Sequence, residues 1–167
     1  MFLNTVIGID PGLSKCAFAV VKSDSTILDF GIIKTDASMK IDHRLLLIQN
    51  GIRDVIAKHK DIKHASIEEV FVNKNPLSSM KLGMARASAI LACASMSINI
   101  HSYSATHIKK SFSGRGRATK EQIYKLITLK YNIDIKKSFD IADAIAIALA
   151  HINYKNPLGS LKICGGT

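Results

Sequence analysis

Residues 5–12 read TVIGIDPG, and this stretch decides the class of fold. Residues 5–9 are apolar and mostly β-branched, a pattern that favours a buried strand. The Asp10-Pro11-Gly12 that follows is typical of a turn and ends the strand. The stretch therefore predicts a buried strand with a carboxylate, that of Asp10, at its end.

After this strand, the spacing of apolar residues is in turn that of strands and that of helices. A meander of two further strands is predicted first, and apolar residues at helical spacing follow it. Pro76 suits the start of a second helix, which carries small residues on one side. The predicted strands cover residues 16–21, 27–34, 65–72 and 97–102. The predicted helices cover about 41–59 and about 76–94. Two or three more helices follow around a Gly/Arg loop at 113–117. This order predicts a mixed α/β sheet covered by helices.

Composition limits the class of protein. The 167 residues suit one domain, and the formal net charge of +10 favours a polyanionic partner, with nucleic acid ahead of an anionic membrane surface. A generally basic proteome would give the same charge. Cys16, Cys93 and Cys164 show neither a disulfide framework nor zinc-site spacing. No signal peptide or membrane span is evident, so we expect a cytoplasmic protein with reduced thiols and no membrane association.

Four carboxylates lie in apolar surroundings. Asp10 ends the first strand, Glu68 lies within a predicted strand, and Asp140 and Asp143 open a largely apolar helix. A charged carboxylate near a core is costly unless something compensates it, and a divalent cation does so efficiently. Carboxylate oxygens are the preferred ligands of Mg²⁺ and Mn²⁺, and two such ions about 4 Å apart catalyse phosphoryl displacement.

Each of these acids also has a plain structural explanation. Asp10 suits a turn, and a solvated strand edge explains Glu68 or its neighbour Glu69. Asp140 and Asp143 complement a helix N-terminus, although their spacing places them on one helix face. No single acid decides between metal binding and these alternatives, but together they can converge on one point.

A basic segment with two glycines precedes the acidic helix. Its charged residues are Lys109, Lys110, Arg115, Arg117 and Lys120. Gly114 and Gly116 allow the backbone to approach a ligand closely, and Thr119 with Gln122 forms a candidate capping box that would present helix N–H groups to a phosphate. An ordinary solvated loop is the alternative.

Several stretches in this order resemble the RuvC family of crossover junction endodeoxyribonucleases. They are IGIDPG at 7–12, IEEVF at 67–71 with Asn75, KLGMAR at 81–86, Ile108-Lys109, GxGxAxKxQ at 114–122, and DxxDAxAxA at 140–148 ending at His151. Any one of them is weak, but the ordered set is specific. The resemblance implies a ribonuclease-H-like fold, with a mixed five-stranded sheet and helices on both faces.

The resemblance also implies roles for individual residues. Asp10, Glu68, Asp140 and Asp143 take the positions of the family's four catalytic and metal-binding acids. Phe71 falls where the family places an aromatic residue near the junction crossover. Lys109 and Lys120 fall on basic positions that face the DNA backbone, and we add Arg115 and Arg117 of the loop as expected DNA contacts.

The implied activity is metal-dependent hydrolysis of phosphodiester bonds in Holliday junctions during recombination and repair, with paired symmetric nicks in strands of like polarity. We expect two Mg²⁺ ions per site, with Mn²⁺ as a substitute, and RuvA and RuvB as partner proteins. A homodimer is implied, with the helix around 80–94 as its interface through Gly83, Ala85, Ala87 and Ala89. Residues 1–153 are expected to form the nuclease domain and residues 154–167 a flexible tail.

Three alternatives stay open on the residues alone. A related nuclease could act on RNA or on another branched substrate. A non-catalytic DNA-binding module would leave the four acids dispensable. A sugar-kinase-like phosphotransferase shares an opening of the form IGIDxG, but it needs a second domain for which 167 residues leave no room.

Overall fold

The computed structural model describes residues 5–70, 75–113 and 118–155 of the chain. Strands and helices alternate after an initial meander, as the sequence predicts. The elements are β1 (Thr5–Asp10), β2 (Lys15–Lys22), β3 (Ile27–Lys34), α1 (Ile41–Lys58), β4 (Ile62–Glu68), α2 (Pro76–Ser95), β5 (Asn99–Tyr103), α3 (Ala105–Ser113), α4 (Lys120–Tyr131) and α5 (Phe139–Lys155).

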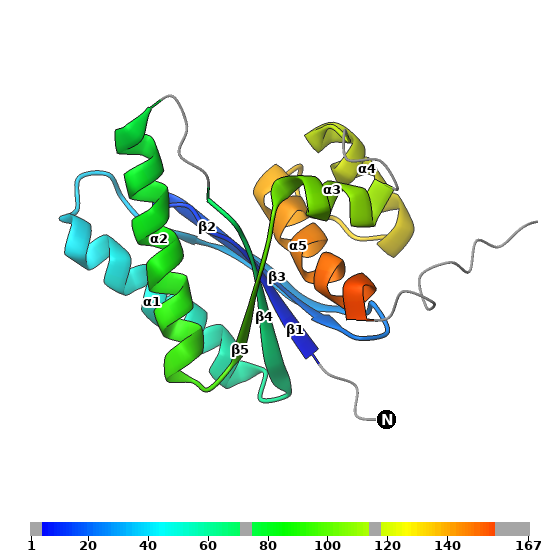
Figure 1. Ribbon diagram of the computed structural model, residues 1–167, viewed down its shortest axis with the longest axis horizontal. Helices are drawn as coiled ribbons and strands as arrows, with labels where there is room; N and C mark the ends of the chain where they lie inside the picture. Colours follow the sequence, from blue (N-terminus) through cyan, green and yellow to red (C-terminus); the bar gives the residue numbers. More distant parts are fainter. Residues whose placement is uncertain (1–4, 71–74, 114–117, 156–167) are drawn as a thin grey trace, which may run out of the picture.

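The strands form one mixed sheet in the order β3-β2-β1-β4-β5. The meander β1-β2-β3 is antiparallel, while β1, β4 and β5 are parallel neighbours. In Figure 1, α1 and α2 cover one face of the sheet and α3, α4 and α5 cover the other. The predicted five-stranded sheet with helices on both faces is therefore confirmed. Because β1 and β4 are parallel, their carboxyl ends meet at the same edge of the sheet.

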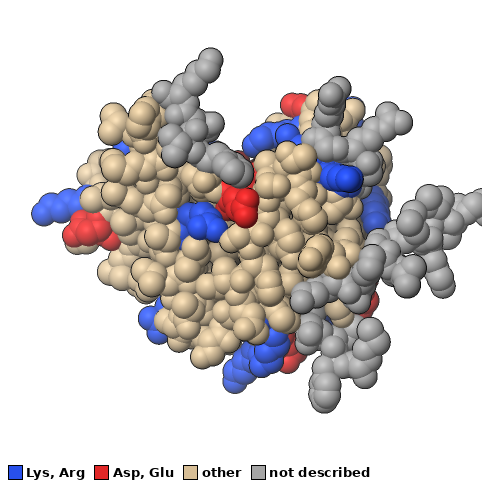
Figure 2. All heavy atoms as spheres, viewed as in Figure 1, with Lys and Arg blue, Asp and Glu red and all other residues tan. Residues whose placement is uncertain are grey.

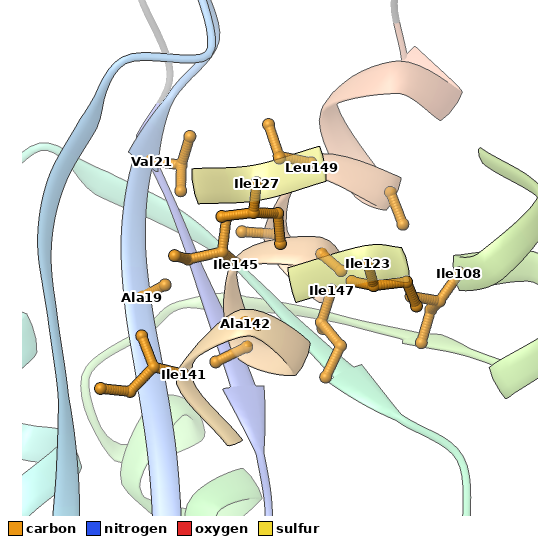
Figure 3. Packing of buried hydrophobic residues seen from close by; sticks show 14 of the residues in the cluster. Ala19, Val21, Ile108, Ile123, Ile127, Ile141, Ala142, Ile145, Ile147 and Leu149 are labelled. Carbon is orange, nitrogen blue, oxygen red and sulfur yellow. The ribbon is translucent and has the colours of Figure 1, made fainter. Parts of the chain in front are cut away.

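Each face of the sheet has its own hydrophobic core. On one face, residues of α1 and α2 pack over alternate side chains of β1, among them Ile7 and Ile9. On the other face, α5 lies directly on β1 and β2, and α3 and α4 close over it. Figure 3 shows this second core, where Ile108, Ile123 and Ile147 from α3, α4 and α5 approach one another. Burial on both sides explains why β1 is apolar almost throughout.

Gly8 sets the distance between β1 and α5. A Cβ atom added at Gly8 would collide with the backbone oxygen of Ala144 and would lie 2.6 Å from the backbone nitrogen of Ala148. Both obstacles are backbone atoms of a buried helix, so they cannot move aside as a flexible side chain would. The glycine therefore lets the helix that carries Asp143 pack directly against the strand that carries Asp10.

Gly8→Ala is expected to destabilise the protein by about 2–3 kcal/mol, because the added methyl group overpacks this contact. The melting temperature should fall by roughly 5–10 °C, which calorimetry would measure. Gly83→Ala is the matched control, since a Cβ atom at Gly83 meets nothing within 4 Å. Equal melting temperatures for the two variants would show that the contact at Gly8 is not tight.

The bounds of one predicted strand and the residues of the predicted dimer interface need correction. The strand predicted over residues 65–72 is β4, which begins at Ile62 and ends at Glu68. Its parallel partner β1 ends at Asp10, so β1 offers no backbone groups beyond that point. The helix predicted from Pro76 is α2, and Asn75 caps it by accepting a hydrogen bond from the Ser78 amide. Ala85 and Ala89, however, are fully buried in this chain's own core, so they cannot form an interface with a second chain.

The C-terminal helix α5 extends to Lys155, two residues beyond the expected end of the domain. The rest of the predicted tail lies outside the described residues. None of the described helices combines the length and the apolar character needed to cross a membrane.

Candidate active site

Three of the four candidate acids come together at the carboxyl edge of the sheet. Asp10 ends β1 and Glu68 ends β4, and the parallel register pairs Ile9 with Ile67, the residues just before them. Asp143 approaches from the first turns of α5, which packs on both strands. All three carboxylates line one open cavity of about 210 Å³. The topology thus collects acids that lie more than 130 positions apart in the chain.

Hydrogen bonds between elements hold the acids in place. The Ser66 hydroxyl, two residues before Glu68, donates to the backbone oxygen of Ile147 at 2.8 Å. Ile147 lies one helical turn after Asp143, so this buried bond sets how β4 meets α5. The Arg86 guanidinium donates to the backbone oxygen of Glu68 at 3.0 Å and to the Ser102 hydroxyl at 2.7 Å, joining the ends of β4 and β5.

Two lysines line the same cavity. Lys109 comes from α3, and Lys120 is the first residue of α4. The predicted capping box is present: the Thr119 hydroxyl accepts from the Gln122 amide, and the Gln122 side chain accepts from the Thr119 amide. It fixes the start of α4 and so places Lys120, whose Nζ lies 2.9 Å from an oxygen of Asp143. Figure 2 shows acidic atoms in the notch between the lobe of α2 and the lobe of α3 and α4, with basic atoms on both sides.

The electrostatics of the cavity are those of crowded carboxylates. Burial, followed by the negative charges of Asp143 and Glu68, raises the pKa of Asp10 to about 7, although Lys120 opposes this shift. Burial and the charge of Asp143 also raise the pKa of Glu68, against the effect of Lys120 and Lys109. Asp143 in turn raises the pKa of Lys120, mainly through their hydrogen bond. The lysines therefore compensate the acids only in part.

A divalent cation fits this donor set. The three carboxylates supply only oxygen atoms, which are the ligands of Mg²⁺ and Mn²⁺. Burial, followed by repulsion from Asp143 and Glu68, raises the pKa of Asp10, and a bound cation would offset both effects by stabilising the charged carboxylate. Asp10, Glu68 and Asp143 are accordingly the residues that would hold the ion.

The remaining predicted site residues are placed differently. Asp140 is half-buried at the start of α5 and contributes to the raised pKa of Asp10, but it does not line the cavity. Phe71, Arg115 and Arg117 lie outside the described residues. Sequence reasoning assigned Lys120 to the DNA backbone and missed its ion pair with Asp143. Arg86 had no predicted role, because the spacing of residues in the sequence does not indicate a hydrogen bond to a distant backbone oxygen.

Known proteins resemble the chain over nearly its full length. The model of the family described as "Crossover junction endodeoxyribonuclease RuvC" matches residues 6–151. The protein of that name from Ehrlichia canis is 38% identical over 153 residues, which cover 90% of this chain and 97% of that one. The one from Anaplasma phagocytophilum is 42% identical over 153 residues, covering 88% and 93%.

A solved structure has the same fold. The structure described as "T. thermophilus RuvC in complex with Holliday junction substrate" superposes with a TM-score of 0.84 at 24% identity, covering 91% of this chain and 94% of that one. At this identity the likeness shows the fold alone, which agrees with the ribonuclease-H-like architecture expected from the sequence. The matched region of the family model includes all four candidate acids.

Proposed function

This chain belongs to the RuvC family of crossover junction endodeoxyribonucleases, a family of metal-dependent nucleases, and we propose that it resolves Holliday junctions with the site formed by Asp10, Glu68, Asp140 and Asp143. The observation that carries this proposal is the cavity at the end of β1 and β4, where three carboxylates meet two lysines. Hydrolysis of a phosphodiester by metal ions needs acids that hold the cations. Lysines beside these acids attract the phosphate backbone of the substrate.

We propose Mg²⁺ as the working ion, with two ions per site and Mn²⁺ as a substitute. When bound, the ions supply Lewis-acid activation of water and stabilise charge on the phosphodiester oxygens. Asp10, Glu68 and Asp143 hold the cations, and Asp140 completes the set from the first turn of α5. Asp10 has a pKa of about 7 without metal, so cation binding competes with its protonation.

The lysines have two distinct roles in this proposal. Lys120 holds Asp143 through the 2.9 Å ion pair and keeps that carboxylate oriented towards the cavity. Lys109 lines the cavity and is placed to contact a backbone phosphate. Arg115 and Arg117 extend the proposed DNA contacts, and Phe71 is proposed to lie near the crossover, on the family resemblance.

A synthetic four-way junction tests the proposed function. Incubation with Mg²⁺ should give paired nicks in two strands of like polarity, and EDTA should abolish them. Linear duplex and RNA hybrids serve as substrate controls. Cutting of RNA in preference to the junction would favour the related ribonuclease, and binding without any metal-dependent product would favour a non-catalytic module.

The salt dependence of binding tests the lysines. Lys109→Ala is expected to weaken junction binding and to lower the slope of log K against log salt by about one unit, since one phosphate contact is lost. Its melting temperature should fall only modestly, because the Lys109 side chain is half-buried rather than part of the core. Lys63→Ala is the control, since this exposed lysine lies at the opposite end of β4. A large stability loss with an unchanged slope would assign Lys109 a structural role instead.

We further propose that the protein acts as a symmetric homodimer through α2. Leu77, Met80, Met84, Ala87, Leu91 and Ala94 follow one another at spacings of three and four residues, so they share one face of the helix. Leu77, Met80 and Leu91 are 65%, 51% and 58% exposed, although they are large apolar side chains. A continuous apolar stripe of this kind is typical of a protein interface. Gly83 adjoins it and has open space above it.

A two-fold dimer suits a junction that needs two symmetric nicks, because each chain supplies ligands for one site only. RuvA and RuvB are proposed partners on the family resemblance. A cytoplasmic location is also proposed, since the free thiols of Cys16 and Cys93 suit a reducing compartment.

A further inference from the structure

Three histidines form a second cluster of metal-ligating side chains, away from the carboxylates. His64 comes from β4, His101 from β5 and His151 from α5. One ring nitrogen from each lies within 4.8 Å of the others. His64 Nδ1 and His101 Nε2 are 3.1 Å apart, and the rings of His101 and His151 have centroids separated by 4.2 Å. We propose that this cluster binds a transition-metal ion of the Zn²⁺ class.

The spacing of the nitrogens suits such an ion. Two imidazole nitrogens that bind zinc tetrahedrally, each about 2.0–2.1 Å from the metal, lie about 3.3 Å from one another. The pair from His64 and His101 already has nearly this separation. The widest separation of the three ligand atoms, up to 4.8 Å, would have to shorten to about 3.3 Å on binding. Three imidazoles with a fourth position open to water form a known kind of zinc site.

Tyr103 supplies the outer contact that a metal-binding histidine needs. Its hydroxyl lies 2.8 Å from Nδ1 of His151, a side chain that is only 2% exposed. A proton on Nδ1 directed at the Tyr103 oxygen leaves Nε2 as the nitrogen that would bind the metal. Such second contacts fix the tautomer and orientation of a ligating histidine. Tyr103 is itself held against His107, whose ring stacks on it at 5.1 Å.

The chemistry of the cluster separates it from the active site. Imidazole nitrogens select Zn²⁺, Ni²⁺, Co²⁺ or Cu²⁺, whereas the oxygen donors of the carboxylates select Mg²⁺ or Mn²⁺. Along α5, His151 lies eight residues beyond Asp143, a distance of about 12 Å. Along β4, His64 lies four residues before Glu68, a distance of about 13 Å. The buried bond from Ser66 to Ile147 lies between the two sites.

Metal in the histidine cluster would join β4, β5 and α5, which are distant in sequence. Two of these elements carry the active-site acids Glu68 and Asp143 at their other ends. The ion would therefore brace the contact between strand and helix from the side opposite the carboxylates. The plain alternative is a set of neutral histidines that only hydrogen-bond and stack with one another.

The test uses the full chain with Asp10→Asn and Asp143→Asn, so that the carboxylate cavity cannot hold the added metal. Co²⁺ at neutral pH should give the visible d–d bands of nitrogen-ligated cobalt, and one equivalent of Zn²⁺ per chain should remove them. Excess Zn²⁺ should raise the melting temperature by about 5 °C, as expected for micromolar affinity.

His64→Ala and His101→Gln are the diagnostic variants, because both side chains are only half-buried and can be replaced without opening a core cavity. Each should lose the cobalt bands and the zinc-dependent shift while it keeps its circular dichroism spectrum. His43→Ala, an exposed histidine on α1, should keep both signals. Absence of cobalt bands in the parent protein, or bands that persist in the His64→Ala, His101→Gln double variant, would overturn the proposal.

Discussion

Asp10→Asn protein is expected to bind a four-way junction but to cut it at least about a thousandfold more slowly, which corresponds to a loss of about 4 kcal/mol of transition-state stabilisation. The neutral amide removes one of the three charges that would hold cations in the cavity. Binding should persist or tighten, because negative charge near the phosphates is lost. Glu68→Gln, Asp140→Asn and Asp143→Asn are expected to behave in the same way. Single-turnover cleavage and gel-shift binding measure the two effects separately.

Glu69→Gln is the matched control, since Glu69 is an exposed neighbour of Glu68. It should cut at nearly the wild-type rate. Full cleavage by the Asp10→Asn protein would contradict the proposed role of the acids, and it would do so whether or not the histidine cluster binds metal.

Thermal stability distinguishes a loss of cutting from a loss of folding in the Asp10→Asn protein. The pKa of Asp10 is raised from 3.8 to about 7, mainly by burial, so its charged form is disfavoured in the folded state. The contribution of protonated Asp10 to the free energy of unfolding is therefore fully present below its unfolded pKa of 3.8, and it is lost as pH rises through the folded pKa of about 7. Without metal, Asp10→Asn protein should melt above wild type at pH 8, by a smaller margin near pH 5, and close to it only below the unfolded pKa of 3.8. A lower melting temperature at pH 8 would show that the carboxylate stabilises the fold.

Leu77→Glu with Leu91→Glu is expected to convert the proposed dimer to a folded monomer. The two leucines are 65% and 58% exposed, so glutamate there leaves the core of the chain intact, but it places charge near both ends of the apolar stripe. We expect the dimer dissociation constant to rise at least about a hundredfold, because two large apolar side chains of the proposed interface are replaced by charges and the loss of one anchoring residue often costs about 2 kcal/mol. Sedimentation over a range of concentrations measures this change.

The same variant should change the product on a supercoiled cruciform. Wild-type protein should give linear DNA from paired nicks, whereas the monomer should accumulate singly nicked circles. In mixtures of wild type with Asp10→Asn protein, the mixed dimers should accumulate singly nicked circles. Leu129→Glu is the control, because Leu129 is 81% exposed on α4 rather than on α2. A wild-type monomer that makes paired cuts would show the dimer proposal to be wrong.

The sequence by itself determined the elements and the candidate acids. The apolar, β-branched run before Asp10 identified a buried strand, and the helical spacing of Leu45, Ile48 and Ile52 identified α1. These signals are local, because an element that is buried on one face or on both faces has a characteristic spacing of apolar residues in the sequence. The capping box at Thr119 was readable for the same reason, since both of its partners lie within one turn. The acids stood out because charge is costly in apolar surroundings.

Only the tertiary structure decided which of these residues meet. The parallel pairing of β1 with β4 joins Asp10 to Glu68, and the close packing of α5 at Gly8 brings Asp143 to both. The ion pair of Lys120 with Asp143, the contact of Arg86 with the Glu68 backbone and the assembly of the three histidines all join separate elements. The division of α2 into a buried face with Ala85 and Ala89 and an exposed apolar stripe also depended on what covers the helix. Such contacts are set by strand order and helix packing, which no local spacing of residues encodes.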